Sequence, residues 1–183
     1  MSAQTSYRHT AAIGSPGGIV DLSPYSVDTF ISEEETGTLK FGVGVFKGKT
    51  AGNGVKLPTS DSVSTDFEGI TVNNRTTETD MEGKLSIRKH SAVGVMRYGK
   101  VYALVATGAE PKYGEPVYII KSGDEAGYVT NKSDGTIPIK ARFAGAADSS
   151  ANVVSVELFN QAQENVKEPE SNSVTKEENN DEG

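Results

Sequence analysis

The sequence contains no cysteine, and this absence removes several kinds of protein chemistry at once. Without thiols the chain forms no disulfide, carries no cysteine nucleophile and offers no cysteine ligand to zinc, so its fold needs no oxidising compartment. Histidine is almost as scarce, since only His9 and His90 are present. A zinc site needs three or four converging ligands. We therefore expect no metal ion and no other cofactor.

Long apolar runs and clusters of positive charge are also missing. No apolar stretch approaches the roughly 18 residues that a membrane-spanning helix needs. The first 18 residues lack the charged start and apolar core of a secretory signal. Asp and Glu total 25 against 18 Lys and Arg, a net charge of −7, whereas nucleic acid binding requires clustered cations. The sequence therefore predicts no membrane and no direct nucleic acid partner.

No arrangement of residues in the chain matches a known catalytic or ion-binding motif. The Gly-x-Ser-x-Gly turn that positions a nucleophilic serine is absent. The Gly-x-Gly pair within 41–48 lacks the third glycine and the following helix of a phosphate-binding loop. The acidic residues that could gather around calcium, although without the spacing of a calcium-binding loop, are Asp61, Asp66, Glu68 and Asp80. We expect that the protein is not an enzyme.

Short stretches of branched and aromatic residues, separated by Gly, Asn and Asp, fill the middle of the chain. They recur about every 8–15 residues, which is typical of an all-β sandwich or barrel. The strands expected from this pattern are 41–46, 68–72, 85–88, 93–96, 101–105, 116–120, 128–130, 137–144 and 153–159. We predict an all-β domain, a compact β-barrel or β-sandwich of short strands, over residues 22–160.

Two local features refine this predicted fold. Asp28 is suited to cap a helix, so one short helix is expected over 28–35. Gly99 is expected to form a tight hairpin turn between two apolar runs, because glycine reaches positive φ at little cost. Glycines inside predicted strands, such as Gly42 and Gly44, indicate bulges or a close approach of two backbones.

Both ends of the chain differ in composition from the middle. Residues 161–183 hold seven acidic residues and two lysines, a net charge of −5, and no aromatic residue. Such a segment buries too little apolar surface to offset the cost of ordering its backbone, roughly 1–2 kcal/mol per residue. We therefore expect a disordered acidic tail. Residues 1–21 combine glycine and proline with isolated apolar residues, which predicts an extended arm able to add as a strand to a partner.

One part of the sequence resembles a known family. Residues 98–105 read Tyr-Gly-Lys-Val-Tyr-Ala-Leu-Val, and residues 108–118 read Gly-Ala-Glu-Pro-Lys-Tyr-Gly-Glu-Pro-Val-Tyr. A Phe-Ala-Gly-Ala stretch at 143–146 and Val-Val-Ser-Val-Glu-Leu at 153–158 follow. This order resembles the head decoration proteins of tailed bacteriophages, also called capsid cement proteins. The family commonly has Gly-Asp where this chain has Glu-Pro before Val-Tyr, and the acidic tail has no counterpart there.

The resemblance implies a structural protein of the virion. Proteins of this family bind the outside of an expanded icosahedral shell, usually as trimers, and clamp neighbouring subunits against the pressure of internal DNA. For this chain it implies the major capsid protein as partner, a homotrimer, synthesis in the bacterial cytoplasm and a place on the outer capsid surface. The residues of the arm that we expect to contact the shell are Tyr7, Arg8, Ile13 and Ile19.

A second function stays open, that of a β-module through which a phage particle binds carbohydrate or another host surface. Exposed aromatic side chains lining one groove would favour it. The tyrosines available for such a groove are Tyr98, Tyr102, Tyr113, Tyr118 and Tyr128. Tyrosine is also common in strands for packing reasons, so its presence does not decide between the two functions.

Overall fold

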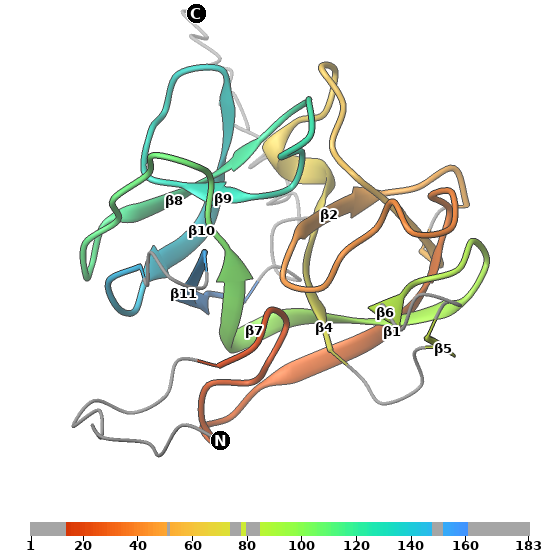
Figure 1. The fold of residues 1–183 in the computed structure, drawn as a ribbon, viewed down its shortest axis with the longest axis horizontal. Coiled ribbons are helices and arrows are strands. Elements are labelled where there is room, and N and C mark those ends of the chain that lie inside the picture. Colours follow the sequence, from red (N-terminus) through yellow and green to blue (C-terminus); the bar gives the residue numbers. More distant parts are fainter. Residues whose placement is uncertain (1–13, 51, 74–77, 80–84, 148–151, 161–183) are drawn as a thin grey trace, which may run out of the picture.

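The structure, a computed structural model, describes residues 14–50, 52–73, 78–79, 85–147 and 152–160. The predicted tail 161–183 and most of the predicted arm lie outside these residues. Within the described residues the regular structure is eleven strands and one short 3-10 turn, which confirms the predicted all-β fold (Figure 1). None of the helical structure described there has the length and apolar character to cross a membrane.

The strands are short and follow one another with tight connections. They are β1 (Ser26–Ser32), β2 (Gly44–Lys47), β3 (Gly54–Lys56), β4 (Phe67–Val72), β5 (Glu78–Thr79), β6 (Leu85–Ser86), β7 (Ala92–Leu104), β8 (Pro116–Ile120), β9 (Val129–Thr130), β10 (Thr136–Phe143) and β11 (Val153–Leu158), with the 3-10 turn η1 (Ser64–Asp66) before β4. β8 has the predicted bounds, and β4 and β11 each differ from prediction by one residue at one end.

Five strands close into a barrel around one part of the core. β1 pairs with β7 and β3, β3 pairs with β2, β2 pairs with β4, and β4 returns to β7. Their inward side chains form a cluster that includes Phe30, Val45, Val55, Val93 and Val95, all nearly or fully buried. The alternation of branched residues along each strand produces this interior, because successive side chains of a strand point to opposite faces.

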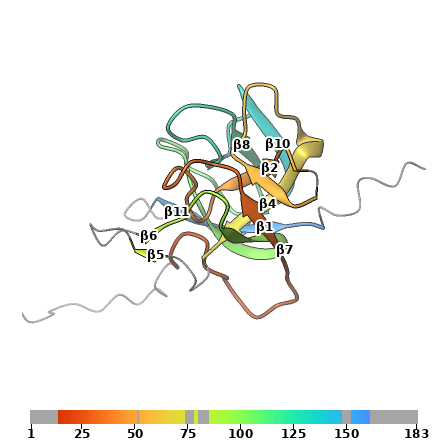
Figure 2. The ribbon, with the colours of Figure 1, turned by 90° about the vertical axis from the view of Figure 1, so that its right-hand side faces the viewer.

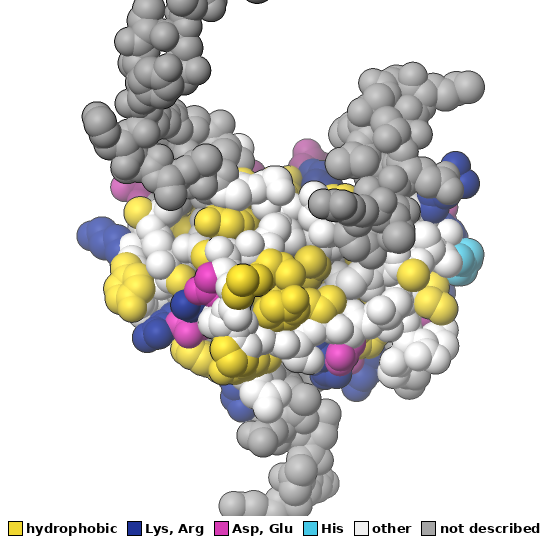
Figure 3. Space-filling view, turned by 90° about the horizontal axis from the view of Figure 1, so that it is seen from below, with side chains coloured by type: hydrophobic (Ala, Val, Ile, Leu, Met, Phe, Trp, Pro, Cys, Tyr) yellow, Lys and Arg dark blue, Asp and Glu magenta, His cyan; other side chains and the backbone are white. Residues whose placement is uncertain are grey.

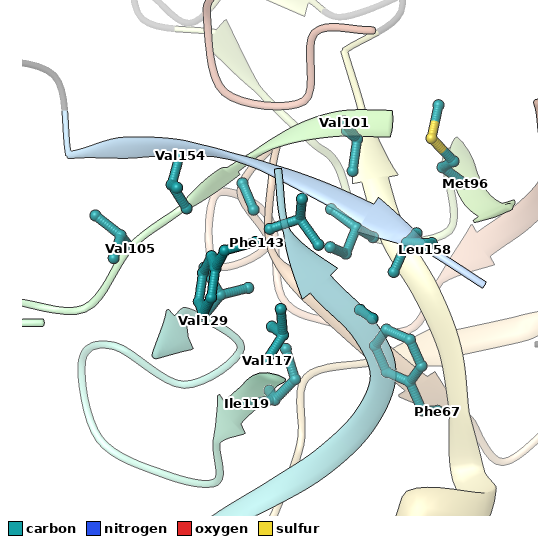
Figure 4. Close-up of a cluster of buried hydrophobic side chains, with 14 of the residues drawn as sticks. Phe67, Met96, Val101, Val105, Val117, Ile119, Val129, Phe143, Val154 and Leu158 are labelled. Carbon is teal, nitrogen blue, oxygen red and sulfur yellow. The ribbon is translucent and has the colours of Figure 1, made fainter. Parts of the chain in front are cut away.

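A second group of strands continues from the C-terminal half of β7. β11 pairs with β7, β10 with β11, β8 with β10 and β9 with β8. A bridge between Val105 and Val129 then brings β9 back to the end of β7. This group encloses the larger core cluster, in which Ile119, Phe143 and Val154 point toward one another (Figure 4). β7 therefore belongs to both halves of the molecule.

The prediction of a hairpin turn at Gly99 is wrong. β7 runs without interruption from Ala92 to Leu104 and bends where it leaves β1 and β4 to pair with β11 (Figure 1). Gly99 has a φ of +115°, and a Cβ placed on it would lie 2.6 Å from the Cβ of Tyr25. The glycine thus permits a bend inside a long strand instead of ending it, because both sides of the bend find strand partners.

The prediction of a short helix over 28–35 is also wrong. β1 occupies the first part of this range, with Thr29 and Ile31 exposed and Phe30 and Ser32 buried in strict alternation. β-Branched residues have few rotamers in a helix and favour strands. Pairing with β7 and β3 therefore outweighs the local tendency to cap a helix.

Candidate functional site

The chain lies against β7 before it enters β1. The N–H of Gly17 donates to the carbonyl of Tyr102 at 2.8 Å, and the N–H of Tyr102 donates to the carbonyl of Gly18 at 2.9 Å. Ile19 forms a bridge with Val101 and is 39% exposed. Of the four residues expected to contact the shell, Ile19 therefore lies at the edge of the chain's own β7. The other three, Tyr7, Arg8 and Ile13, lie outside the described residues.

A charged pair fixes the next part of this segment. The ammonium group of Lys100 donates to the carboxylate of Asp21 at 2.9 Å. The hydroxyl and backbone N–H of Ser23 also donate to this carboxylate. The hydrogen bond from Ser23 and that from Lys100 lower the pKa of Asp21 to about 2, because both stabilise the ionised form. The segment before β1 is thus attached to β7 by backbone and side-chain bonds together.

The outward side of β1 carries an apolar surface. Tyr25, Val27 and Ile31 project from alternate positions and are 48%, 37% and 44% exposed. We call these three residues the β1 face. β1 and β7 run along the lower side of the molecule (Figures 1 and 2), and the view from below shows hydrophobic side chains gathered there (Figure 3). Exposed apolar side chains that gather on one surface make that surface a candidate for contact with another protein.

The backbone of β1 also lacks a strand partner on one side. Among the described residues β1 pairs with β3 only through Ile31 and Ser32. The N–H of Ile31 donates away from β7, to Asn53, while that of Ser32 donates to Ser91 on the side of β7. Backbone groups alternate in direction along a strand, so those of Val27 and Thr29 point away from β7 as Ile31 does. Among the residues that the structure describes, this part of β1 is an open sheet edge.

The charged side chains next to the β1 face are paired with one another. Arg97 of β7 contacts Asp28 of β1 at 3.4 Å and Glu68 of β4 at 3.1 Å. Lys100 contacts Asp21 at 2.9 Å, and the pairing raises the pKa of Lys100. Two cations and three carboxylates thus form these pairs, so the named charges leave a net charge of −1 beside the apolar β1 face.

A second exposed cluster lies at the end of β10 and β11. The guanidinium of Arg142 lies 5.9 Å from the ring of Tyr113 and 5.8 Å from the ring of Phe159. Its Nε donates to Glu157 at 2.6 Å, which raises the pKa of Arg142. Tyr and Arg are common in the energetically important centres of protein interfaces. Tyr113 is 70% exposed, so this cluster is a further surface able to contact another protein.

Three hollows on the described surface show no catalytic arrangement. The largest, about 450 Å³, is lined by the loop 105–112 together with Ala146, Ala147 and Asn152. A second contains Lys40 and Tyr128. Of the five tyrosines considered for sugar binding, only Tyr128 lines any of these three hollows. The tyrosines therefore do not gather in one of these hollows as a stacking platform.

The acidic residues considered for calcium are not assembled in the described structure. Glu68 is engaged with Arg97, and Asp80 lies outside the described residues. Within the described part of the chain, no three Asp, Glu or His side chains lie close enough together to hold a metal ion.

Sequence reasoning missed the β1 face because the segment was expected to be helical. A signal was present, since Tyr25, Val27, Thr29 and Ile31 occupy every second position. Such an alternation of apolar and β-branched residues is typical of a half-buried strand. The exposure of this row follows from the tertiary structure, in which nothing described covers the outer side of β1.

Comparison with known proteins agrees with these features. The sequence profile of a family described as structural cement protein (E217 gp24/Pam3 gp6) matches residues 3–159. A chain from the solved structure titled the capsid of Myoviridae phage XM1 has the same fold, with a TM-score of 0.64 and 20% sequence identity over 86% of this chain and 98% of that chain. None of the curated proteins compared with the sequence matches it. The chain therefore belongs to the phage structural cement protein family, and it is a structural, capsid-associated protein of the virion.

Proposed function

We propose that the protein binds the outer surface of an expanded phage capsid and cements neighbouring major capsid protein subunits against the pressure of internal DNA. The observation that carries this proposal is the apolar β1 face on a domain that the cement family matches over residues 3–159. An exposed apolar surface is costly in water and gains free energy when a protein partner covers it.

The architecture suits a clamp. A clamp transmits force between the subunits that it joins, so its two ends must not move independently. β7 is hydrogen bonded to strands of both halves of the molecule and links the two core clusters. Close-packed interiors of this kind have low compressibility. A homotrimer would add three moderate contacts, and linking them raises the apparent affinity without any new contact in each copy.

The arm adds a second contact with the shell in this proposal. Residues 1–13, which include Tyr7, Arg8 and Ile13, span at most about 43–47 Å when fully extended. Ile19 marks the point where the chain is already bonded to β7. The arm thus starts from a fixed base and is long enough to reach a neighbouring subunit.

Binding to isolated capsids tests the proposal. Expanded capsids that lack the protein are mixed with the full chain, a chain that begins at residue 14 and a chain that ends at Asn160, and each mixture is sedimented. We expect the full chain to cosediment and the chain without residues 1–13 to bind much more weakly. The chain without the acidic tail should bind as the full chain does, because the tail carries charge but almost no apolar residue that could be buried against the shell.

Each outcome bears on a separate part of the proposal. A full chain that stays in the supernatant with expanded capsids would overturn the proposed function. Unchanged binding of the chain that begins at residue 14 would exclude the arm as a contact, and weaker binding of the chain that ends at Asn160 would assign the tail to docking. Capsids filled with DNA and decorated with the full chain should withstand heating better than undecorated ones.

A further inference from the structure

We infer that the open edge of β1 is completed on the shell by an extended, apolar segment of the major capsid protein without acidic side chains, which adds as a strand beside Val27 and Thr29 and covers the β1 face. The inference rests on the proposed function and names the surface and the kind of partner segment. Its first support is the backbone of β1 at these two positions, which no described strand pairs on the side away from β7, since only Ile31 and Ser32 reach β3. An open edge accepts an extended segment through main-chain hydrogen bonds.

The side chains around this edge define what the added strand must present. The side chain of Val27 lies over Gly94 of β7. A Cβ on Gly94 would lie 3.2 Å from Cγ1 of Val27, so one side of Val27 packs against β7 and the other faces solvent. Tyr25 and Ile31 continue the row two and four residues away. Neighbouring strands stabilise each other through side chains that lie directly opposite on one face. The added strand therefore carries apolar side chains at alternate positions.

Charge decides between possible occupants. Asp28 and Glu68 share the one guanidinium of Arg97, and Asp21 is paired with Lys100, so the charges named beside the β1 face sum to −1. An acidic segment would lose its hydration there and meet this excess negative charge. The chain's own acidic segment 161–183, with a net charge of −5, is excluded on this ground.

The chain's own N-terminal segment is disfavoured by its starting point. Gly14 lies against the ring of Tyr102, whereas Thr29 pairs with Gly94. These two points are eight residues apart along β7, about 26 Å at the rise of an extended strand. The backbone from Val20 back to Gly14 runs along β7 away from β1, so about eight of the thirteen residues before Gly14 would be used to return to the open edge, which leaves few to pair with it.

One pair of variants at Thr29 tests the backbone contact. Thr29→Pro removes an N–H that points away from β7, so the bonds between β1 and β7 are kept, and proline is tolerated at such edge positions. Thr29→Val keeps the N–H and the shape of the side chain. We expect Thr29→Pro to weaken binding to expanded capsids by up to about tenfold, as the loss of one hydrogen bond predicts, and Thr29→Val to bind as the unmodified chain does.

A second pair tests the apolar surface. The double variant Val27→Lys with Ile31→Lys places two charges on the β1 face and should abolish cosedimentation. Val63→Lys is the matched control, because Val63 is 53% exposed but lies in the loop before η1 and not on β1. Thermal unfolding of each variant verifies that it is folded. If Thr29→Pro does not fold, the lysine double variant still tests whether the β1 face contacts the shell.

The outcomes separate this inference from the proposed function. If the unmodified chain does not bind capsids, the proposed function fails. If it binds and both Thr29→Pro and the lysine double variant bind equally well, the function stands and the inference is overturned. If these variants instead dissociate an oligomer of the free protein, measured by light scattering, the β1 face joins copies of this chain and the inference is overturned. Electron microscopy of decorated capsids should show a strand of the shell protein beside β1.

Discussion

Thr71 is a buried polar residue whose hydrogen bonds are complete. Its Oγ1 accepts the N–H of Val43 at 3.0 Å and donates to the carbonyl of Lys40 at 2.9 Å. Thr71→Val leaves the N–H of Val43 without this acceptor inside the barrel, so we expect the free energy of unfolding to fall by about 1–3 kcal/mol. Urea unfolding followed by circular dichroism measures the change.

Ser32 provides the matched comparison at the same scale. It is also fully buried, but its hydroxyl has no hydrogen bond partner among the described residues. Ser32→Ala removes a polar group that is already unsatisfied and should leave stability unchanged or slightly raised. A large loss of stability in Ser32→Ala, or none in Thr71→Val, would contradict this account of the barrel interior.

The lowered pKa of Asp21 predicts how the stability of the fold changes with pH. Its pKa is lowered from 3.8 to about 2 by the hydrogen bonds from Ser23 and Lys100, so the folded protein favours the ionised carboxylate. The stabilisation is present above about pH 4 and is lost as the pH falls toward 2. Urea midpoints between pH 5 and pH 2 should fall less steeply in Asp21→Asn than in the unmodified chain. Parallel curves would show that this carboxylate does not contribute.

At the scale of the element, β7 depends on one glycine. Gly99→Ala would place a Cβ 2.6 Å from the Cβ of Tyr25 at a φ of +115°, which combines backbone strain with a clash. We expect the free energy of unfolding to fall by about 2–4 kcal/mol, which is more than backbone strain alone would cause. Gly108→Ala is the control, because φ is +71° and a Cβ there has open space, and it should cost only about 1 kcal/mol. Equal losses in the two variants would exclude the clash with Tyr25.

Elements differ in how far the sequence predicts them. β8 is found where its alternating residues place it, because a strand in the middle of a sheet needs only its own pattern and two turns. β3 has three residues, too few for any periodic signal, and is formed by its neighbours β1 and β2. Residues 28–35 show that a local cap signal is weaker than pairing with a distant strand.

At the scale of the molecule, the two core clusters should unfold together. The barrel cluster contains Val95 and the larger cluster contains Ile119, and β7 is hydrogen bonded to strands of both. Calorimetry of the unmodified chain should therefore show one transition whose calorimetric and van't Hoff enthalpies agree. Val95→Ala should reduce the free energy of unfolding by about 2 kcal/mol and Ile119→Ala by about 2–5 kcal/mol. Each variant should lower the midpoint temperature of that single transition. Two separate transitions, each sensitive to one variant, would contradict this prediction.

The amino-acid sequence by itself determined the class of the fold and excluded the chemistry that requires cysteine. Period-two alternation and regularly spaced turns specify strands locally, and the lack of cysteine and the scarcity of histidine are properties of composition. The order of residues from 98 to 158 was also enough to indicate the cement family, since it can be compared without knowing any contact.

Only the tertiary structure decided how the strands close and which surface stays open. Whether Gly99 turns the chain or bends a strand depends on β1, β4 and β11, which lie far away in the sequence. In the same way, Val27 and Ile31 are exposed because no described strand covers the outer side of β1, although their residue types alone would suit a core. Contacts between distant segments fix such features, and no local pattern contains them.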